Sequence, residues 1–196
     1  MRKKLALALS IALAVALAIA WFKLVRKPFP SDTTPDGAYL RIVVKAVDMD
    51  DPAQMFPYLE EDARWSAYTI RDARAKACAM IRESYPEAQR AELLAAYGDE
   101  AAAPDGADVV ALMARKRGWL ARLRRDTSGV KSVEIEGARA TVVTARGTRY
   151  PFRRRDNGIW GLTIFTAELM DEAKRASRDL DVVEAAAADY ARAKKN

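Results

Sequence analysis

The sequence predicts an α+β protein behind an N-terminal transmembrane helix. Residues 5–22 carry no charge, residues 36–125 show mainly the 3.6-residue period of helices, and from Thr127 the period changes to two. The helical period returns at Thr166. Because the alternating segments follow the helices and do not alternate with them, the sheet should be antiparallel. We therefore expect a transmembrane helix, a helical N-terminal half, a four-stranded antiparallel curved sheet and a long C-terminal helix.

The net charge belongs to the N-terminal region. The chain has 196 residues, with 33 Lys and Arg against 27 Asp and Glu. Six of the basic residues and none of the acidic ones precede Pro28, so the remainder is neutral. The excess positive charge therefore flanks the uncharged stretch and does not by itself indicate an anionic partner such as a nucleic acid, which we do not expect.

The uncharged stretch fits a membrane anchor over residues 5–25, preceded by a basic segment at residues 1–4. Its 18 residues would form a helix about 27 Å long, close to the thickness of the bilayer hydrocarbon core. The residues expected to contact lipid are Leu5, Leu9, Leu13, Leu17 and Trp21.

Three basic side chains lie on each side of the span, and the free amino terminus favours a cytoplasmic N-terminal end with an exported, periplasmic or extracytoplasmic domain. A cleaved signal peptide is the alternative, because Ala16-Leu17-Ala18 and Ala18-Ile19-Ala20 match the small-x-small cleavage pattern. The domain would then be secreted.

Residues 26–35 form a proline-rich linker, and residues 36–165 form the main domain. Asp36 is expected to cap a helix reaching Val47, and Asp51-Pro52 to begin a short one. Further helices are expected over residues 61–85, from Pro86 to Tyr97, and over residues 108–125. The segment at residues 99–107 should be a mobile loop because it contains an alanine run and Pro-Asp-Gly.

Four strands come next in the sequence. Val133 and Ile135 alternate with charged residues, and residues 140–145 continue after a turn at Gly137. Tyr150 and Phe152 mark the third strand, and residues 159–165 the fourth. Asn157-Gly158 between them is the strongest hairpin signal in the chain.

The C-terminal helix, residues 166–196, carries a heptad seam. The seam comprises Leu169, Ala173, Ala176, Leu180, Val183, Ala187 and Tyr190. It can pack within the same domain, or it can mediate self-association or docking of a partner.

The residue inventory argues against an enzyme. The chain has no histidine and one cysteine, and it lacks the glycine-rich motifs that bind phosphates. Asp48, Asp50 and Asp51 suit helix capping better than metal binding, and Cys78 suits a small core position. We expect no catalytic residue, no metal and no cofactor.

Two groups of residues are candidates for binding. Residues 115–155 hold 13 basic and 3 acidic side chains. The basic block can face anionic lipid or pair with the acidic N-terminal half. The residues of this block expected to face lipid are Arg115, Lys116, Arg117, Arg122, Arg153, Arg154 and Arg155. The aromatic residues that can line a pocket or form plain core are Trp65, Tyr68, Tyr150, Phe152 and Trp160.

The strand region resembles the C-terminal half of NTF2-like domains. The resemblance rests on Val133-x-Ile135-x-Gly137, on Gly147-x-x-Tyr150-x-Phe152, and on Asp156-x-Gly158-x-Trp160. It implies helices followed by a curved antiparallel sheet over residues 36–165. The helical half is longer than is usual in that family, and the C-terminal helix is an addition. The cavity carboxylate of the family's enzymes has no counterpart that can be placed here.

These observations together suggest a membrane-anchored envelope domain of non-enzymatic type. It would bind a partner protein, peptide or lipid-like ligand in the concave face of the sheet, or act as a scaffold. One alternative is an acid–base enzyme without histidine, which requires a carboxylate of raised pKa among Tyr150, Phe152 and Trp160. The other is a homo-oligomer formed through the C-terminal helix.

Overall fold

The computed structural model describes residues 30–193, and the chain divides into two compact units, Met1–Pro30 and Ser31–Asn196. The expected anchor and its five lipid-contacting residues, Leu5, Leu9, Leu13, Leu17 and Trp21, lie outside the described residues. Between residues 30 and 193, no helix combines the length and apolarity needed to cross a membrane. The helices and strands of this range, from Pro35 to Ala193, all belong to the second unit.

The first helices are short and irregular. Helix α2 (Pro35–Arg41) continues into a π-helical turn, η1 (Ile42–Asp48), where one continuous α-helix was expected. The cap is Thr34 and not Asp36, because the Thr34 hydroxyl accepts a hydrogen bond from the backbone of Gly37. Asp51 does cap the following 3₁₀ helix η2 (Pro52–Tyr58), as predicted.

Helices α3 (Glu61–Ser84) and α4 (Glu87–Ala101) come next. The expected loop at residues 99–107 is shorter, because α4 continues past Gly98 and Asp105 caps α5 (Gly106–Arg117). The helix expected over residues 108–125 is interrupted. Gly118 has a φ of 65°, in the left-handed region, and separates α5 from α6 (Trp119–Arg124).

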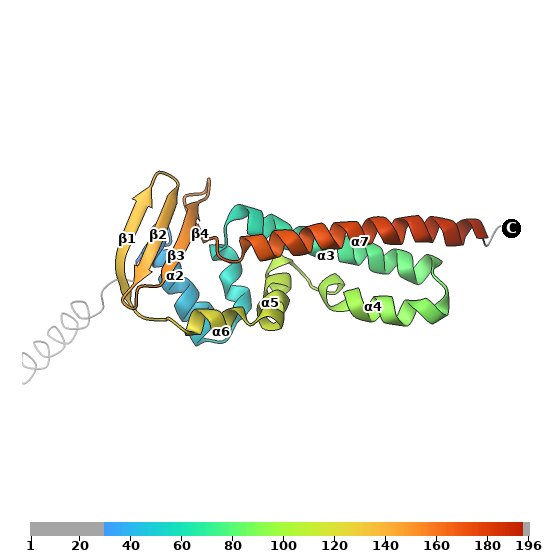
Figure 1. Ribbon diagram of the computed structural model, residues 1–196, viewed down its shortest axis with the longest axis horizontal. Coiled ribbons are helices and arrows are strands. Elements are labelled where there is room, and N and C mark those ends of the chain that lie inside the picture. Colours follow the sequence, from blue (N-terminus) through green and yellow to red (C-terminus); the bar gives the residue numbers. More distant parts are fainter. Residues whose placement is uncertain (1–29, 194–196) are drawn as a thin grey trace, which may run out of the picture. The chain divides into compact units, whose positions relative to one another are not determined.

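The four strands form one antiparallel sheet in the order β1-β2-β3-β4, as the meander predicts. They are β1 (Val130–Glu136), β2 (Arg139–Thr144), β3 (Arg149–Arg154) and β4 (Trp160–Leu162). The fourth strand is shorter than expected. The register aligns Val133, Val142 and Tyr150 in one row across the sheet. Helix α2 packs against this sheet (Figure 1).

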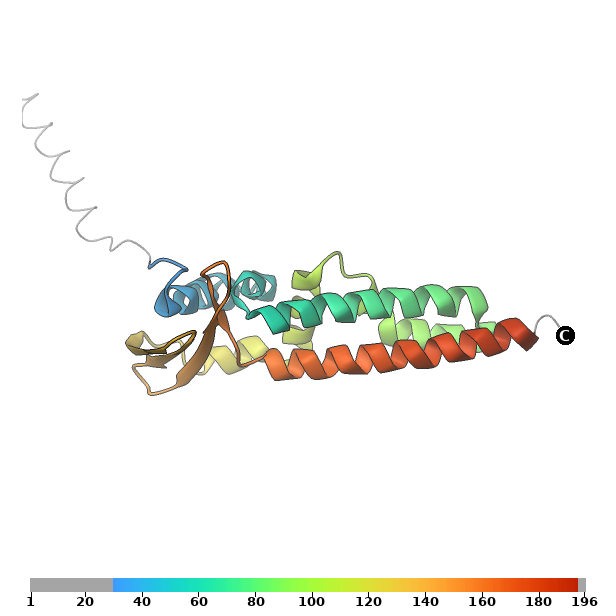
Figure 2. The same cartoon turned by 90° about the horizontal axis from the view of Figure 1, so that it is seen from above.

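The long C-terminal helix α7 (Thr166–Ala193) lies alongside α3, as both views show (Figures 1 and 2). Its heptad seam faces its own domain. Leu169 and Ala173 belong to the main core, and Val183 packs with Ala77 and Ile81 of α3. The prediction that the seam packs within the domain is confirmed.

Candidate functional site

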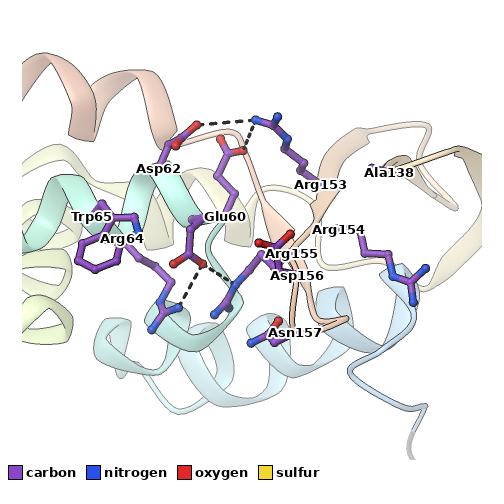
Figure 3. A pocket seen from close by; sticks show the side chains of 11 residues that line it. Glu60, Asp62, Arg64, Trp65, Ala138, Arg153, Arg154, Arg155, Asp156 and Asn157 are labelled. Atoms are coloured by element: carbon purple, nitrogen blue, oxygen red, sulfur yellow. Dashed lines mark hydrogen bonds and ion pairs between the residues drawn. The ribbon is translucent and has the colours of Figure 1, made fainter.

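A surface groove lies between the start of α3 and the hairpin that joins β3 to β4 (Figure 3). Its volume is about 770 Å³. Acidic and basic side chains face each other across it, and the lining residues are Glu60, Glu61, Asp62, Arg64, Trp65, Ala138, Arg153, Arg154, Arg155, Asp156 and Asn157. Its charge is therefore balanced, with four residues of each sign.

Glu61 connects the two walls of the groove. One of its carboxylate oxygens lies 3.5 Å from a guanidinium nitrogen of Arg64 and 3.1 Å from Nε of Arg155. Arg155 also donates to the backbone carbonyl of Pro57 at 2.7 Å, so its guanidinium is fixed in the wall. Burial of Arg155 and the nearby charge of Arg64 lower the pKa of Arg155, although Glu61 acts in the opposite direction.

Trp65 supplies the apolar part of the groove. Its side chain is 63% exposed, which is unusual for the largest apolar residue type. A second hollow of about 480 Å³ continues along α3 and shares Glu61, Arg64 and Trp65 with the first. Tyr68 lies beside Trp65 with ring centroids 6.1 Å apart.

Two arginines of α3 lie against aromatic rings in this region. The guanidinium of Arg64 lies 5.0 Å from the ring centre of Phe56, and that of Arg71 lies 5.4 Å from that of Tyr68. Residues 64, 65, 68 and 71 follow helical spacing, so they share one face of α3. The cation–π contacts orient these arginines on that face.

The five aromatic residues predicted as pocket lining separate into two groups. Trp65 and Tyr68 line the hollows along α3. Tyr150, Phe152 and Trp160 are buried in the main core, because they point to the sheet face that α2 covers. The ring centroid of Tyr150 lies 5.1 Å from that of Tyr39 on α2.

The seven basic candidates lie on two parts of the fold, and five of them face carboxylates. On α5 and α6, Lys116 contacts Glu100, Arg117 contacts Glu168 and Glu172, and Arg122 contacts Glu168. Arg153 lies 3.7 Å from Asp62, and Arg155 contacts Glu61. Arg115 and Arg154 are exposed. Intramolecular pairing therefore uses much of the positive charge of this block.

A buried carboxylate that the sequence did not indicate as a candidate lies near Tyr150. Asp126 accepts hydrogen bonds from the backbone and the hydroxyl of Ser128 at 3.1 and 2.5 Å, and from the Thr144 hydroxyl. Its backbone carbonyl accepts the hydroxyl of Tyr150 at 3.1 Å. The Asp-x-Ser pattern at residues 126–128 was the available sequence signal, since aspartate readily bonds the backbone two residues on.

Asp126 is ionised at neutral pH, whereas a general acid must carry a proton. Burial alone would raise the pKa of its carboxyl, but the hydrogen bonds from Ser128, Thr144 and Thr148 outweigh burial. They hold the pKa well below its ordinary value, so the group is an ionised acceptor at neutral pH. The enzyme alternative needs a raised pKa at this place, and Asp126 does not supply it.

The remaining candidates have structural surroundings. Asp51 caps η2, and Asp50 accepts a hydrogen bond from Arg124 at 2.6 Å. Cys78 is buried, and burial raises the pKa of its thiol. Among the described residues no group of three or more His, Cys, Asp or Glu side chains is arranged to hold a metal ion. Comparisons with family models, curated proteins and solved structures found no match for this chain.

Proposed function

We propose that this chain is a membrane-anchored, non-enzymatic binding domain that recognises a segment of a partner protein through the groove at Trp65. The observation that carries the proposal is the 63% exposed indole of Trp65, set between charged walls. Tryptophan, tyrosine and arginine are the residue types that dominate binding energy at protein interfaces. All three stand on this face of α3.

The charge pattern of this face favours a partner other than a second copy of the chain. Along the helix the order is acidic Glu61, basic Arg64, the aromatic pair, basic Arg71 and acidic Asp72. Antiparallel pairing of two copies that places Arg64 opposite Arg71 would bring Glu61 within two residues, about 3 Å along the helix, of the position opposite Asp72. Parallel pairing would place each side chain opposite itself. Both arrangements oppose like charges, which disfavours self-association through this face.

The pattern also indicates what the partner segment should present. An apolar side chain would cover Trp65, and carboxylates on either side would reach Arg64 and Arg71. These two arginines are seven residues apart, or about 10 Å along the helix. The site differs from the expected concave face of the sheet, where Tyr150, Phe152 and Trp160 are buried.

The NTF2-like identity of the domain and its attachment to a membrane are part of the same proposal. Support for the first is the order of helices followed by a four-stranded meander that closes at Trp160. Support for the second is the uncharged stretch of residues 5–22 between basic residues. An anchor would concentrate the groove near partners on the same membrane.

Photo-cross-linking in the cell of origin tests the binding proposal. A photoreactive phenylalanine analogue replaces Trp65 in the full-length chain, and a matched chain carries it at Val182, which is 68% exposed on α7. We expect a discrete product with another protein in the membrane fraction from position 65 only. Arg71→Ala on the same chain should lower its yield about fivefold or more, as at an interface hot spot.

Three outcomes would contradict the proposal: no discrete product at position 65, the same products at both positions, or a product containing two copies of the chain. Trp65→Ala provides the folding control. Because the side chain is largely exposed, its removal should change the free energy of unfolding by no more than about 0.5 kcal/mol.

A further inference from the structure

The apolar interior of the Ser31–Asn196 unit is divided into two clusters. The first joins the sheet to the helices around it and ends at Ile70 on α3 and Ala173 on α7. The second begins at Ala77 on α3 and Leu180 on α7, and it includes apolar residues of α4. We call residues 77–101 and 180–193 the distal arm. In Figures 1 and 2 its helices extend away from the sheet.

A buried ionic layer lies between the two clusters. Arg74 of α3 is 3% exposed, and its guanidinium contacts one carboxylate of α4 and two of α7. The distances are 3.2 Å to Glu100, which belongs to the distal arm, and 3.5 Å to Glu172 and 2.6 Å to Asp179, which precede the arm on α7. The guanidinium also lies 4.2 Å from the ring centre of Tyr97.

The surroundings of Arg74 keep its guanidinium positively charged although it is buried. Burial by itself lowers the pKa of Arg74, but the hydrogen bond and charge of Asp179 and the charge of Glu100 raise it by more. Arg74 therefore remains charged. Glu100 and Glu172 are 7% and 6% exposed, so both depend on cations close by. The other cations in contact are Lys116 at Glu100, and Arg117 and Arg175 at Glu172.

The division of the interior has a consequence for cooperativity. Apolar contacts couple neighbouring segments in folding. At this layer the buried apolar side chains are small (Ala73, Cys78 and Ala176), so the two clusters are coupled mainly by the ion pairs and by the backbones of α3 and α7, which run through the layer. If Arg74 lost its charge, the carboxylates around it would be left buried with less compensation, which is strongly unfavourable. Opening of the arm would let water reach Glu100, the carboxylate that the arm contributes, while the first cluster would keep its contacts.

We propose that the distal arm is a separate cooperative unit, latched to the rest of the domain by Arg74, and that it opens while the sheet and its surrounding helices stay folded. This inference does not depend on the binding role of the Trp65 groove. The conformational change that it predicts is the opening of the distal arm at the ionic layer.

Hydrogen exchange followed by mass spectrometry tests the proposal on the full chain. In the wild type, amides of α4 and of residues 180–193 should exchange through a more frequent opening than amides of β2 and β3. Arg74→Met keeps the bulk of the side chain and removes its charge. We expect arm exchange to rise about a hundredfold or more, the scale for an uncompensated buried charge. Protection of β2 and β3 should change less than about threefold.

Arg82→Met is the matched control, because Arg82 is exposed near the end of the same helix. It should leave exchange in both regions unchanged. A uniform rise over the arm and strands in Arg74→Met, or complete loss of strand protection, would overturn the proposal, since either means a single cooperative unit. Unchanged exchange of the arm amides in Arg74→Met would also overturn the proposal, because Arg74 would then not hold the arm closed.

Exchange of the wild type in increasing urea, below the unfolding transition, gives an independent measurement if Arg74→Met folds poorly. Separate opening free energies for the arm and the strands are expected. A single shared value at every urea concentration would contradict the proposal.

Discussion

Gly161 lies where β4 passes against the junction of η2 and α3. A Cβ atom there would be 2.5 Å from both the Cα and the backbone nitrogen of Glu60. These are backbone atoms, so they cannot rotate away as the end of a side chain could. The contact belongs to a bridge between Leu59 and Leu162 that holds the start of α3, and thereby the groove, at the edge of the sheet.

Gly161→Ala should therefore lower the free energy of unfolding by about 1–3 kcal/mol or more, as overpacking does. Gly98→Ala is the control, since Gly98 lies within α4 and a Cβ there meets no atom within 4 Å. It should leave stability unchanged or raise it by up to about 1 kcal/mol. Urea unfolding measures the free energy of unfolding of the two variants. Equal changes in both would show that the close approach of Gly161 to Glu60 does not matter for stability.

Helix α7 is an integral part of the domain, because its first turns are buried in the main core. Leu169 is fully buried in the main core, and Trp119 and Phe165 stack just before it with ring centroids 4.3 Å apart. Glu168 accepts hydrogen bonds from Nε1 of Trp119 at 2.9 Å and from Arg122 at 2.6 Å. These contacts attach the first turns of α7 to α6. Self-association through its other faces stays a prediction.

Two neighbouring residues of α7 test this placement. Leu169→Ala should cost about 2–5 kcal/mol of unfolding free energy, because it leaves a cavity in the main core. Met170→Ala removes a side chain of similar size that is partly exposed, and should cost no more than about 1 kcal/mol. Thermal unfolding followed by circular dichroism gives the comparison. Similar losses from both variants would contradict the packing of this turn.

Across the whole domain, Asp126 joins elements that are far apart in the sequence. Its carboxylate bonds Ser128 and Thr144, and its carbonyl accepts the Tyr39 and Tyr150 hydroxyls at 3.4 and 3.1 Å. The junction thus connects α2, the α6–β1 loop, β2 and β3. Because the carboxylate is ionised in the folded state, its contribution to stability depends on pH.

The sign of this dependence is set by the lowered pKa. Between its folded and unfolded pKa values, Asp126 binds fewer protons when folded, so stability rises with pH. Its contribution should be complete above its ordinary pKa of 3.8 and be lost as pH falls below that value. Asp126→Asn should therefore lose stability at pH 7 and approach the wild type toward pH 2. Urea titrations at several pH values measure this, and a constant difference over the range would contradict it.

Much of the fold follows from local signals in the sequence. The change of period at Thr127 predicts the meander, Asn157-Gly158 predicts its last hairpin, and Asp51-Pro52 predicts the start of η2. The inward direction of Tyr150 and Phe152 follows from strand alternation. Element ends were less predictable. The π-helical turn after Arg41 and the extension of α4 past Gly98 have no counterpart in the helical period or in the position of that glycine.

The binding surface could be predicted only in part. Trp65 and Tyr68 stand out in the sequence, but the sequence groups them with core aromatics, because periodicity does not show which helix face another element covers. The sequence likewise does not show the ion pairs that Arg74 and Glu61 form with residues distant in the chain. The sequence determined the composition, the local periods and the uncharged N-terminal stretch. The pairing of charges, the burial of particular aromatics and the division of the interior are visible only in the folded chain, because they depend on contacts between residues distant in the sequence.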